Sequence, residues 1–489
     1  MRRCPTMTLM LAVTLVLSGT VQADETTLDA QQVARRRAGN ALGLYAKLLC
    51  SGVFVCEREP QEFIENDLQR AGLPLPGWDA IKVRVDRTGQ SVTLRFKASS
   101  KWGDLPPRTA VFNGSQGCTL LPLGEERVFF KPVAVESALP PASQQAWPLG
   151  DVLPDAPLPA EVDEPALAAA LDFAFDDSQQ SVPQNTRAIV VLHEGRLIAE
   201  RYADGFDQHS RHVCWSMGKS ITAALVGLLV GESHFDVDDP APIPQWRQRN
   251  DPRGAITIAD LLHMSGGLKF GRGTAQNGLY FTEGDHHTAV YFGAVNVFDY
   301  SVARELEHPP NTVWRYRNCD PLALGSIVRN TVEAGRGDYL SYPQRELFDK
   351  IGARNFVLEV DAWGNFIMTG FDYGTARDWA RFGLLHLQDG VFAGQRVLPE
   401  GWVDFIRAPA PANEAKNYGG LFWLNAGGQY EKLPRDMYWP AGHHGQVVMT
   451  IPSHDMVIVR IGHSALGGFG PYIAEVTHRI LASVEAGDE

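Results

Sequence analysis

The sequence predicts an α+β protein in which one antiparallel sheet is flanked by helices, with a mostly helical insert and an additional N-terminal α+β region. Three observations predict this fold. Two strand patterns joined by a Gly-containing turn occupy residues 188–202, and helical patterns dominate from about 235 to 395. Strand patterns resume at residue 421, and a helical pattern closes the chain. Early strands, a helical insert, late strands and a closing helix are typical of one sheet with helices packed against it.

The chain begins with the pattern of a secretory signal peptide. Met1-Arg2-Arg3 is followed by an apolar stretch at 7–17 and then by small residues up to Ala23. We expect cleavage after Ala23 and a periplasmic or secreted mature protein. The apolar stretch is shorter than the roughly 20 residues of a membrane helix, and no other long uncharged apolar run follows, so we expect no stable membrane span in the mature form.

Residues 24–150 form the predicted N-terminal accessory region with its connection. A helical pattern at 28–49 precedes two alternating stretches at 81–85 and 92–96, which are typical of half-buried strands. Eight prolines between 132 and 165 indicate a linker or a wrapped connection. The interaction surface of a binding protein could lie in this region.

Residues 151–489 form the predicted main domain. A largely buried helix is expected from Ser216 to Val230, because Ile221, Leu225 and Leu228 recur at helical spacing. The other expected helices are 258–264, 321–332, 342–351, 376–387 and 473–484, and the late strands are 421–424, 446–451 and 456–461. The last two strands form a predicted antiparallel hairpin.

Charge and metal-ligand spacing exclude several classes of protein. The formal net charge is −13 and no Lys/Arg cluster stands out, which disfavours nucleic-acid binding. No Cys-x-x-Cys occurs, and the pairs His286-His287 and His443-His444 lack the i, i+4 spacing of a helical zinc site. We therefore expect a small-molecule partner and neither a metal nor a cofactor, while the sequence does not indicate an oligomeric state.

Five cysteines remain after the signal segment, namely Cys50, Cys56, Cys118, Cys214 and Cys319. An oxidising compartment permits disulfides, and an odd count leaves at least one thiol. The sequence leaves the pairing open, and we favour Cys50 with Cys118. Cys214 and Cys319 each flank a candidate motif, so we expect them to lie near each other.

The first candidate motif is Ser216-Met217-Gly218-Lys219. A serine at a helix start lies near the positive end of the helix dipole, and a lysine three residues later lies one turn away on the same face. A serine hydroxyl needs a neighbouring base to act as a nucleophile, and a lysine can serve when it is desolvated. Such a pair in isolation is more often an ordinary exposed lysine on the first turn of a helix.

Two later motifs supply possible partners. Tyr316 offers a phenol that can shuttle a proton near Lys219, and Asn318 points to the same side if the segment is extended. His443-His444-Gly445-Gln446 leads into a predicted strand, where a glycine lets substrate approach the backbone. A backbone N–H there, together with that of Ser216, could form an oxyanion hole.

A rival nucleophile is Ser265 in His263-Met264-Ser265-Gly266-Gly267. It lacks the first glycine of a Gly-x-Ser-x-Gly elbow and has no preceding buried strand, so we favour Ser216.

The ordered motifs resemble the serine beta-lactamase-like superfamily, with the nearest likeness to class C-type enzymes, esterases and 6-aminohexanoate-dimer hydrolases. The resemblance spans about residues 180–487. It rests on Trp215 to Ser220, Leu261 to Leu268, Trp314 to Asn318, Asp378 to Gly383 and Gly442 to Gln446. The resemblance implies the beta-lactamase/transpeptidase fold, with Ser216 as acylated nucleophile, Lys219 as base and Tyr316 as proton relay. It also implies that Asn318 positions substrate and that the backbone N–H groups of Ser216 and Gln446 form the oxyanion hole.

Two residues depart from the family pattern. His443 stands where penicillin-recognising members carry the Lys of Lys-Thr-Gly, and Asn311 replaces a glycine before the Trp-x-Tyr segment. A neutral His443 favours an exported serine esterase or amidase that acts on small esters or linear amides. The alternatives are a beta-lactamase or D-amino-acid peptidase related to penicillin-binding proteins, and a non-catalytic binding protein on the same fold.

Overall fold

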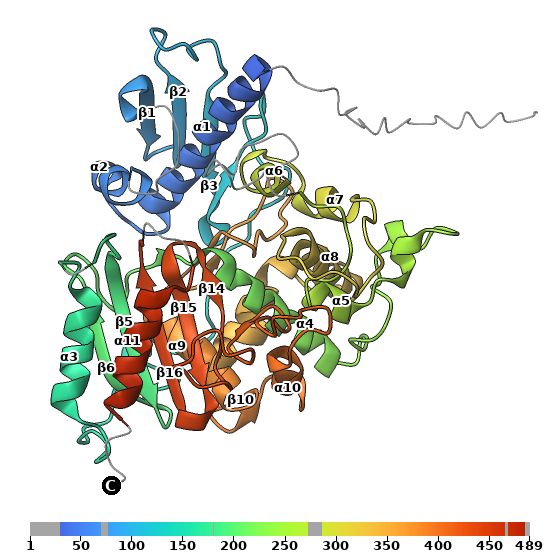
Figure 1. Cartoon of the computed structure of the whole chain (residues 1–489). Coiled ribbons are helices and arrows are strands. Elements are labelled where there is room, and N and C mark those ends of the chain that lie inside the picture. Colours follow the sequence, from blue (N-terminus) through green and yellow to red (C-terminus); the bar gives the residue numbers. More distant parts are fainter. Residues whose placement is uncertain (1–29, 70–76, 179, 272–285, 465–467, 485–489) are drawn as a thin grey trace, which may run out of the picture.

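The computed structural model describes residues 30–69, 77–178, 180–271, 286–464 and 468–484 (Figure 1). The expected signal peptide lies outside these ranges. Among the described residues, no helix combines the length and apolar character that crossing a membrane requires. The predicted α+β class is confirmed, with an antiparallel sheet flanked by helices.

The main sheet has strand order β12-β13-β15-β16-β5-β6, and β14 pairs with β15. Its strands are β5 (Thr186–His193), β6 (Arg196–Tyr202), β12 (Trp423–Leu424), β13 (Tyr438–Trp439), β14 (Ala441–Gly442), β15 (Gln446–Ile451) and β16 (Met456–Gly462). All of these pairings are antiparallel. The early strands therefore pair with the late ones at the contact of β5 with β16, although more than 250 residues separate them in the chain.

Helices cover both faces of this sheet. The helices α3 (Glu164–Phe175) and α11 (Pro471–Ala482) pack together on one face, and α9 (Ala376–Leu387) packs on the other. Every residue of β5, β15 and β16 is buried, because both faces of these strands are covered. Gly383 lets α9 approach, since a Cβ there would lie 2.6 Å from a methyl group of Val457.

The region between the two groups of strands is mostly helical, as predicted. It holds α4 (Gly218–Gly231), α5 (Ile258–Leu262), α6 (His286–Phe292), α7 (Val297–Val302) and α8 (Cys319–Ala334), and after it come β10 (Val391–Phe392), β11 (Gln395–Arg396) and α10 (Trp402–Arg407). The helical segment expected at 342–351 is confirmed, but its turns change type, because a π turn over Gln344–Phe348 is followed by a 3-10 turn over Asp349–Ile351.

A small three-stranded sheet inside this region was not predicted. Its strands are β7 (His212–Val213), β8 (Val357–Leu358) and β9 (Asp372–Gly374). Strands of two or three residues are too short to show a period in the sequence, so no local pattern could reveal them. Strand β9 matters for the site, because it pairs with the segment that leads directly to Ser216.

The N-terminal region packs one long helix across a sheet of its own. Helix α1 (Ala30–Phe54) lies against the antiparallel strands β1 (Ile81–Asp86), β2 (Ser91–Phe96), β3 (Arg108–Phe112) and β4 (Cys118–Leu120) (Figure 1). The short helix α2 (Pro60–Phe63) lies between α1 and β1 in the chain. The favoured disulfide is confirmed, since Cys50 of α1 is bonded to Cys118 of β4.

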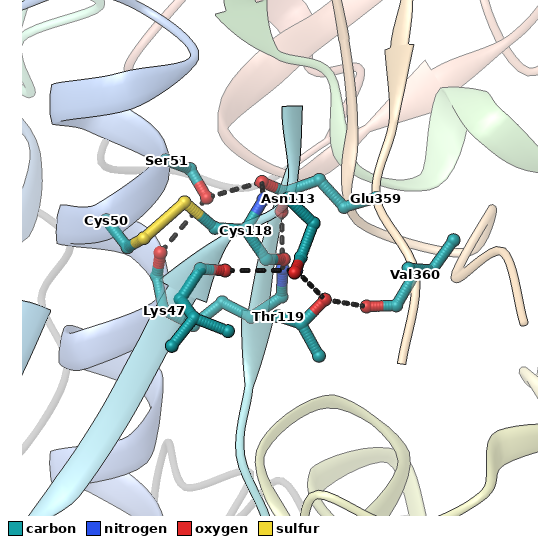
Figure 2. Close-up of a disulfide and its surroundings, with 9 residues drawn as sticks. Lys47, Cys50, Ser51, Asn113, Cys118, Thr119, Glu359 and Val360 are labelled. Carbon is teal, nitrogen blue, oxygen red and sulfur yellow. Dashed lines mark hydrogen bonds and ion pairs between the residues drawn. A yellow bond between two sulfur atoms is a disulfide. The ribbon is translucent and has the colours of Figure 1, made fainter. Parts of the chain in front are cut away.

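A buried polar junction joins this region to the rest of the chain (Figure 2). Lys47 of α1 forms an ion pair with Glu359, and both side chains are almost fully buried. Ser51 Oγ and the backbone N–H of Cys118 each donate to Glu359 Oε1 at 2.7 Å. Burial raises the pKa of Glu359, and the neighbouring Lys47 acts against that rise. Removing either partner would leave a buried charge uncompensated, so this junction holds α1 firmly in place.

The Pro-rich connection wraps the surface instead of hanging free. The guanidinium of Arg381 on α9 donates to the carbonyls of Pro148 and Gly150, both at 2.7 Å, and to the Asp151 carboxylate at 2.6 Å. One buried side chain therefore fastens the connection to the helix beneath it.

Candidate active site

Ser216 and Lys219 lie together at the start of α4. Lys219 Nζ is 2.8 Å from Ser216 Oγ and donates to it. Ser216 is half-buried, and Lys219 is 1 % exposed. The helix begins at Gly218 and not at Ser216, which instead occupies a 3-10 turn over Trp215–Met217. The tight turn still places the two side chains one helical turn apart, so the local geometry brings hydroxyl and amine into contact.

The turn that carries Ser216 is strained at the residue before it. Trp215 has φ of +54°, a region that bulky side chains avoid at a cost of roughly 1–2 kcal/mol. The backbone N–H of Cys214 donates to the carbonyl of Asp372 on β9 at 2.8 Å, which holds this segment against the small sheet. Strain held by surrounding structure is typical of functional sites.

The carbonyl oxygen of Thr369 is a shared acceptor beneath the pair. It lies 3.1 Å from Lys219 Nζ and 3.4 Å from Ser216 Oγ, and the hydroxyl of Tyr291 on α6 also donates to it. Neither Tyr291 nor Thr369 was identified from the sequence, because neither belongs to a motif with a fixed spacing from Ser216. Together they fix the position of the lysine amine.

Tyr316 lies next to the lysine. Lys219 Nζ is 4.9 Å from the centroid of the Tyr316 ring, and that ring packs against Trp423 at 5.3 Å and Tyr418 at 5.8 Å. Tyr316 is half-buried and lines the same cavity as Ser216. The structure therefore brings together the three groups of the Ser216, Lys219 and Tyr316 motifs.

The residue after Tyr316 is structural. The guanidinium of Arg317 is fully buried and donates to the carbonyls of Leu268, at 2.5 Å, and Met264, at 3.4 Å. These bonds attach the Tyr316 segment to the stretch that contains the rival nucleophile. Ser265 in that stretch is 0 % exposed and bonds to the carbonyl of Asp260, so it is not positioned as a nucleophile.

Asn318 lines the same cavity as Tyr316. Its φ and ψ are −93° and −19°, and it is the N-cap of α8. Asn318 is 1 % exposed, and its side chain interacts with the Tyr291 phenol at the cavity. A buried amide that lines a cavity is suited to binding an oxygen of a substrate.

His443 and His444 form a 3-10 turn with Gly445 at the edge of the same cavity. The turn is held from below by Arg460 of β16, whose buried guanidinium donates to the carbonyls of His444 at 3.1 Å and Gly445 at 2.9 Å. A Cβ on the preceding Gly442 would lie 2.0 Å from the Cys214 carbonyl. Only glycine permits this approach, which sets the turn directly beside the Ser216 segment.

Two residues predicted for the substrate site face elsewhere. A Cβ on Gly445 would meet Arg460 at 2.7 Å and Ile473 at 3.1 Å, so this glycine makes room for the arginine and not for substrate. The side chain of Gln446 is bonded to both backbone polar groups of Gly462. The sequence could not reveal this neighbour of Gly445, because Arg460 comes from a strand that is adjacent only in three dimensions, and a role of Gly445 at the substrate site stays a prediction. The contribution of the Gln446 backbone N–H to an oxyanion hole stays a prediction.

Three histidine rings near Ser216 are neutral at ordinary pH. The ring centroids of His443 and His444, and those of His444 and His463, are each 4.0 Å apart. Burial lowers the pKa of His443 and of His463 to about 4, and that of His444 further still. The position occupied by a lysine in penicillin-recognising relatives is therefore uncharged here.

One buried carboxyl is coupled to Lys219. Asp372 is 0 % exposed, and a Cβ on Gly218 would lie 2.5 Å from its Oδ1. Burial raises the pKa of Asp372 well above its usual value, while the charge of Lys219 acts in the opposite direction. No sequence pattern pointed to Asp372, since it reaches Lys219 through the unpredicted strand β9.

Cys214 and Cys319 are separate buried thiols, and no disulfide joins them. Cys214 accepts a hydrogen bond from the indole of Trp379 at 2.9 Å, whereas Cys319 bonds to the Asp320 carboxyl at 3.2 Å. Burial raises the pKa of both thiols. Neither thiol is therefore activated as a nucleophile.

The cavity around Ser216 has a volume of about 890 Å³. One side is aromatic and is formed by Trp314, Tyr316, Trp423 and Trp439. Another side comes from the N-terminal region and is formed by Leu44, Leu48, Phe63, Asp67 and Leu68, which we call the N-terminal wall. None of the wall residues was predicted as part of the site.

Residues 182–474 match the beta-lactamase family. The chain belongs to this family. It is 26 % identical over 333 residues to the 6-aminohexanoate-dimer hydrolase of Paenarthrobacter ureafaciens, covering 64 % of this chain and 83 % of that protein. Its relatives are hydrolases, and we regard the chain as a beta-lactamase-fold hydrolase.

Solved structures share the fold at low sequence identity. A family VIII carboxylesterase is 13 % identical with a TM-score of 0.51, over 67 % of this chain and 99 % of that one. A penicillin-binding protein homolog from Caulobacter crescentus is 14 % identical with a TM-score of 0.50, over 68 % and 99 % of the two chains. The N-terminal wall lies outside the residues that match the family.

Proposed function

We propose that this protein is an exported serine hydrolase that cleaves small esters or linear amides through an acyl-enzyme on Ser216. The observation that carries the proposal is the 2.8 Å hydrogen bond between Lys219 Nζ and Ser216 Oγ, beside Tyr316 and inside a cavity large enough for a small substrate. A nucleophile in contact with a base that a third group orients is the arrangement that acyl transfer requires.

In acylation, Ser216 Oγ attacks the substrate carbonyl carbon while Lys219 accepts the hydroxyl proton. The Thr369 carbonyl accepts one N–H of the amine, which holds a neutral Lys219 amine beside Oγ. The carbonyl oxygen becomes an oxyanion next to the backbone N–H groups of Ser216 and Gln446. Tyr316 then donates a proton to the departing oxygen or nitrogen, and the bond to the leaving group breaks.

In deacylation, a water molecule attacks the carbonyl carbon of the acyl-enzyme, and Ser216 Oγ is the leaving group. Tyr316, which lost its proton to the leaving group, removes the proton of the water, and Ser216 Oγ leaves with the proton that Lys219 took up during acylation. Asn318 lines the cavity, which supports a positioning role for its side-chain amide.

The neutral His443 favours esters and linear amides over penicillins. A drug carboxylate needs a cation where this chain carries His443, and burial lowers the pKa of that imidazole to about 4. The named relatives, a 6-aminohexanoate-dimer hydrolase and a carboxylesterase, support linear amides and esters as the substrate class.

Labelling with a fluorophosphonate probe followed by peptide mass spectrometry tests the proposal. We expect one adduct, on Ser216, and loss of both the adduct and ester hydrolysis in Ser216→Ala. Ser265→Ala is the matched control, because Ser265 is buried away from the cavity, and it should keep labelling and activity. A folded protein without an adduct would support the non-catalytic binding protein, and nitrocefin turnover lost in Ser216→Ala would support the beta-lactamase alternative.

Export is proposed from the first 23 residues. N-terminal sequencing of protein recovered from the periplasm or medium should begin at Asp24, and full-length protein retained in the cytoplasm would contradict it.

A further inference from the structure

The N-terminal wall belongs to the same cavity as Ser216 although it lies outside the beta-lactamase match. Leu44 and Leu48 come from one face of α1, while Phe63 and Leu68 follow in α2 and the turn after it. Each of these side chains is at most 5 % exposed. Their apolar atoms therefore face the cavity or the protein interior and not bulk solvent.

Buried tethers fix the wall in place. Lys47, the residue before Leu48, is paired with Glu359, and Asp67, the residue before Leu68, forms a two-pronged pair with Arg187 of β5 at 2.7 and 3.0 Å. On the adjoining strand β3, Arg108 donates to the carbonyl of Phe292 at the end of α6 at 3.1 Å. A wall anchored at three points presents a rigid surface, which is what discrimination between ligands by shape requires.

The wall carries little net charge. Asp67 is its one ionisable side chain, and both Arg187 and Arg58, the latter at 2.6 Å, neutralise it. The remaining members are leucine and phenylalanine side chains, and Phe292 continues the apolar surface on α6. A charged group placed against this surface would lose hydration without gaining a partner, whereas an alkyl or aryl group would gain free energy.

The two sides of the cavity fit the two halves of a substrate. Under the proposed mechanism Tyr316 protonates the leaving group, so the leaving group lies on the aromatic side, where Tyr316 packs against Trp423. The acyl chain must then extend away from Tyr316. The N-terminal wall and α6, which contact each other, offer an apolar surface of the same cavity to it.

We propose that the N-terminal wall is an acyl-chain subsite, which selects substrates whose acyl group carries an uncharged apolar chain. This inference rests on the proposed function and deepens it by naming the acyl class. The N-terminal region thus acts as a specificity element built onto the family fold. Each methylene buried there should raise kcat/KM about fourfold until the subsite is full.

The test is a series of p-nitrophenyl esters from acetate to octanoate, which keeps the leaving group constant. Leu48→Trp should fill the subsite and lower the octanoate-to-acetate ratio of kcat/KM at least tenfold. Leu42→Ala is the matched control, because Leu42 is fully buried in the same helix and does not line the cavity. It should lower thermal stability and leave the ratio unchanged.

A second variant and a second substrate test the subsite independently, in case Leu48→Trp does not fold. Phe63→Leu shortens the wall and should shift the preferred acyl length upward by one or two methylenes. In wild type, p-nitrophenyl 6-aminohexanoate should react at least tenfold more slowly than the hexanoate, because its ammonium meets an apolar surface.

The subsite proposal would be overturned if both folded variants kept the wild-type octanoate-to-acetate ratio of kcat/KM. It would also be overturned if the 6-aminohexanoate ester reacted as fast as the hexanoate. If the ratios instead change in a series that varies the alcohol, the wall binds the leaving group and the acyl assignment is wrong. Fluorophosphonate labelling of Ser216 separates these outcomes from failure of the proposed function, because labelling does not depend on the acyl chain.

Discussion

Lys219 and Tyr291 donate hydrogen bonds to the same backbone acceptor, the carbonyl oxygen of Thr369. One residue comes from α4 and the other from α6, so the shared carbonyl connects the proposed base to a helix that no sequence motif linked with catalysis. Burial also raises the pKa of the Tyr291 phenol, which keeps the hydroxyl protonated as a donor. The position of the Lys219 amine therefore depends on Tyr291.

Tyr291→Phe should lower kcat/KM for a p-nitrophenyl ester about tenfold or less without abolishing it. A hydrogen bond of this kind is worth about 1 kcal/mol, and its loss frees the carbonyl that orients Lys219. Fluorophosphonate labelling should still occur on Ser216, only more slowly. An unchanged labelling rate would show that Tyr291 does not hold the amine in place.

Tyr316→Phe should discriminate between leaving groups. The variant keeps the ring that packs against Trp423 but loses the proton donor. We expect a loss of about 10²–10⁴-fold in kcat/KM for an alkyl ester or an anilide. The loss should be much smaller for p-nitrophenyl esters, whose leaving group needs no proton. Equal losses across a leaving-group series would assign the phenol a role other than proton donation.

His443→Lys should raise the activity toward nitrocefin relative to a neutral ester. Burial lowers the pKa of His443 to about 4, so the wild-type ring is neutral above about pH 5 and supplies no cation for a carboxylate. His443→Gln is the control and should leave the nitrocefin-to-ester ratio unchanged. For neutral esters, the pH profile of kcat/KM between pH 6 and 9 should be the same in wild type and His443→Gln, because the imidazole does not titrate there.

Asp67→Asn should destabilise the protein at neutral pH and less so in acid. The pKa of Asp67 falls from 3.8 to about 2, because the attraction of Arg187 and Arg58 outweighs the effect of burial. A lowered carboxyl pKa stabilises the fold above about pH 4, and this contribution is lost as the pH falls from 4 to 2. It amounts to about 2 kcal/mol.

Urea unfolding at pH 7 and pH 3 measures this difference. Asp104→Asn is the matched control, because Asp104 also pairs with an arginine but is exposed, and it should be indistinguishable from wild type. An equal deficit of Asp67→Asn at both pH values would argue against linkage through this carboxyl.

Gly218→Ala should disturb the start of α4. A Cβ at this position would lie 2.5 Å from Oδ1 of Asp372 and 2.8 Å from the carbonyl oxygen of Met368. Relieving that overlap should cost about 1–3 kcal/mol of stability and should displace Ser216 and Lys219. Thermal unfolding and ester hydrolysis should both fall. Gly39→Ala, in open space on α1, should instead raise the melting temperature slightly, and a loss there would undermine the comparison.

The central elements were predictable because their signals are local. Helix α9 matches its predicted range of 376–387, and the hairpin of β15 and β16 follows from two apolar runs around a short turn. The sequence predicted that β5 and β16 belong to the same sheet, but not that they are neighbours in it. Strands β7 to β9 could not be inferred at all, because two or three residues carry no period and their partners are distant in sequence.

The sequence by itself determined that Ser216 and Lys219 lie one turn apart, since an i, i+3 spacing in a helical turn places two side chains on the same face. The Thr369 carbonyl and Tyr291 then hold the lysine amine in position. It also determined the order of the motifs and the absence of a lysine at position 443. Tertiary structure alone decided that Gly445 serves Arg460, and that Leu44 and Leu48 border the cavity of Ser216. Those relationships join segments that are far apart in the chain, and packing between distant segments leaves no periodic trace in either of them.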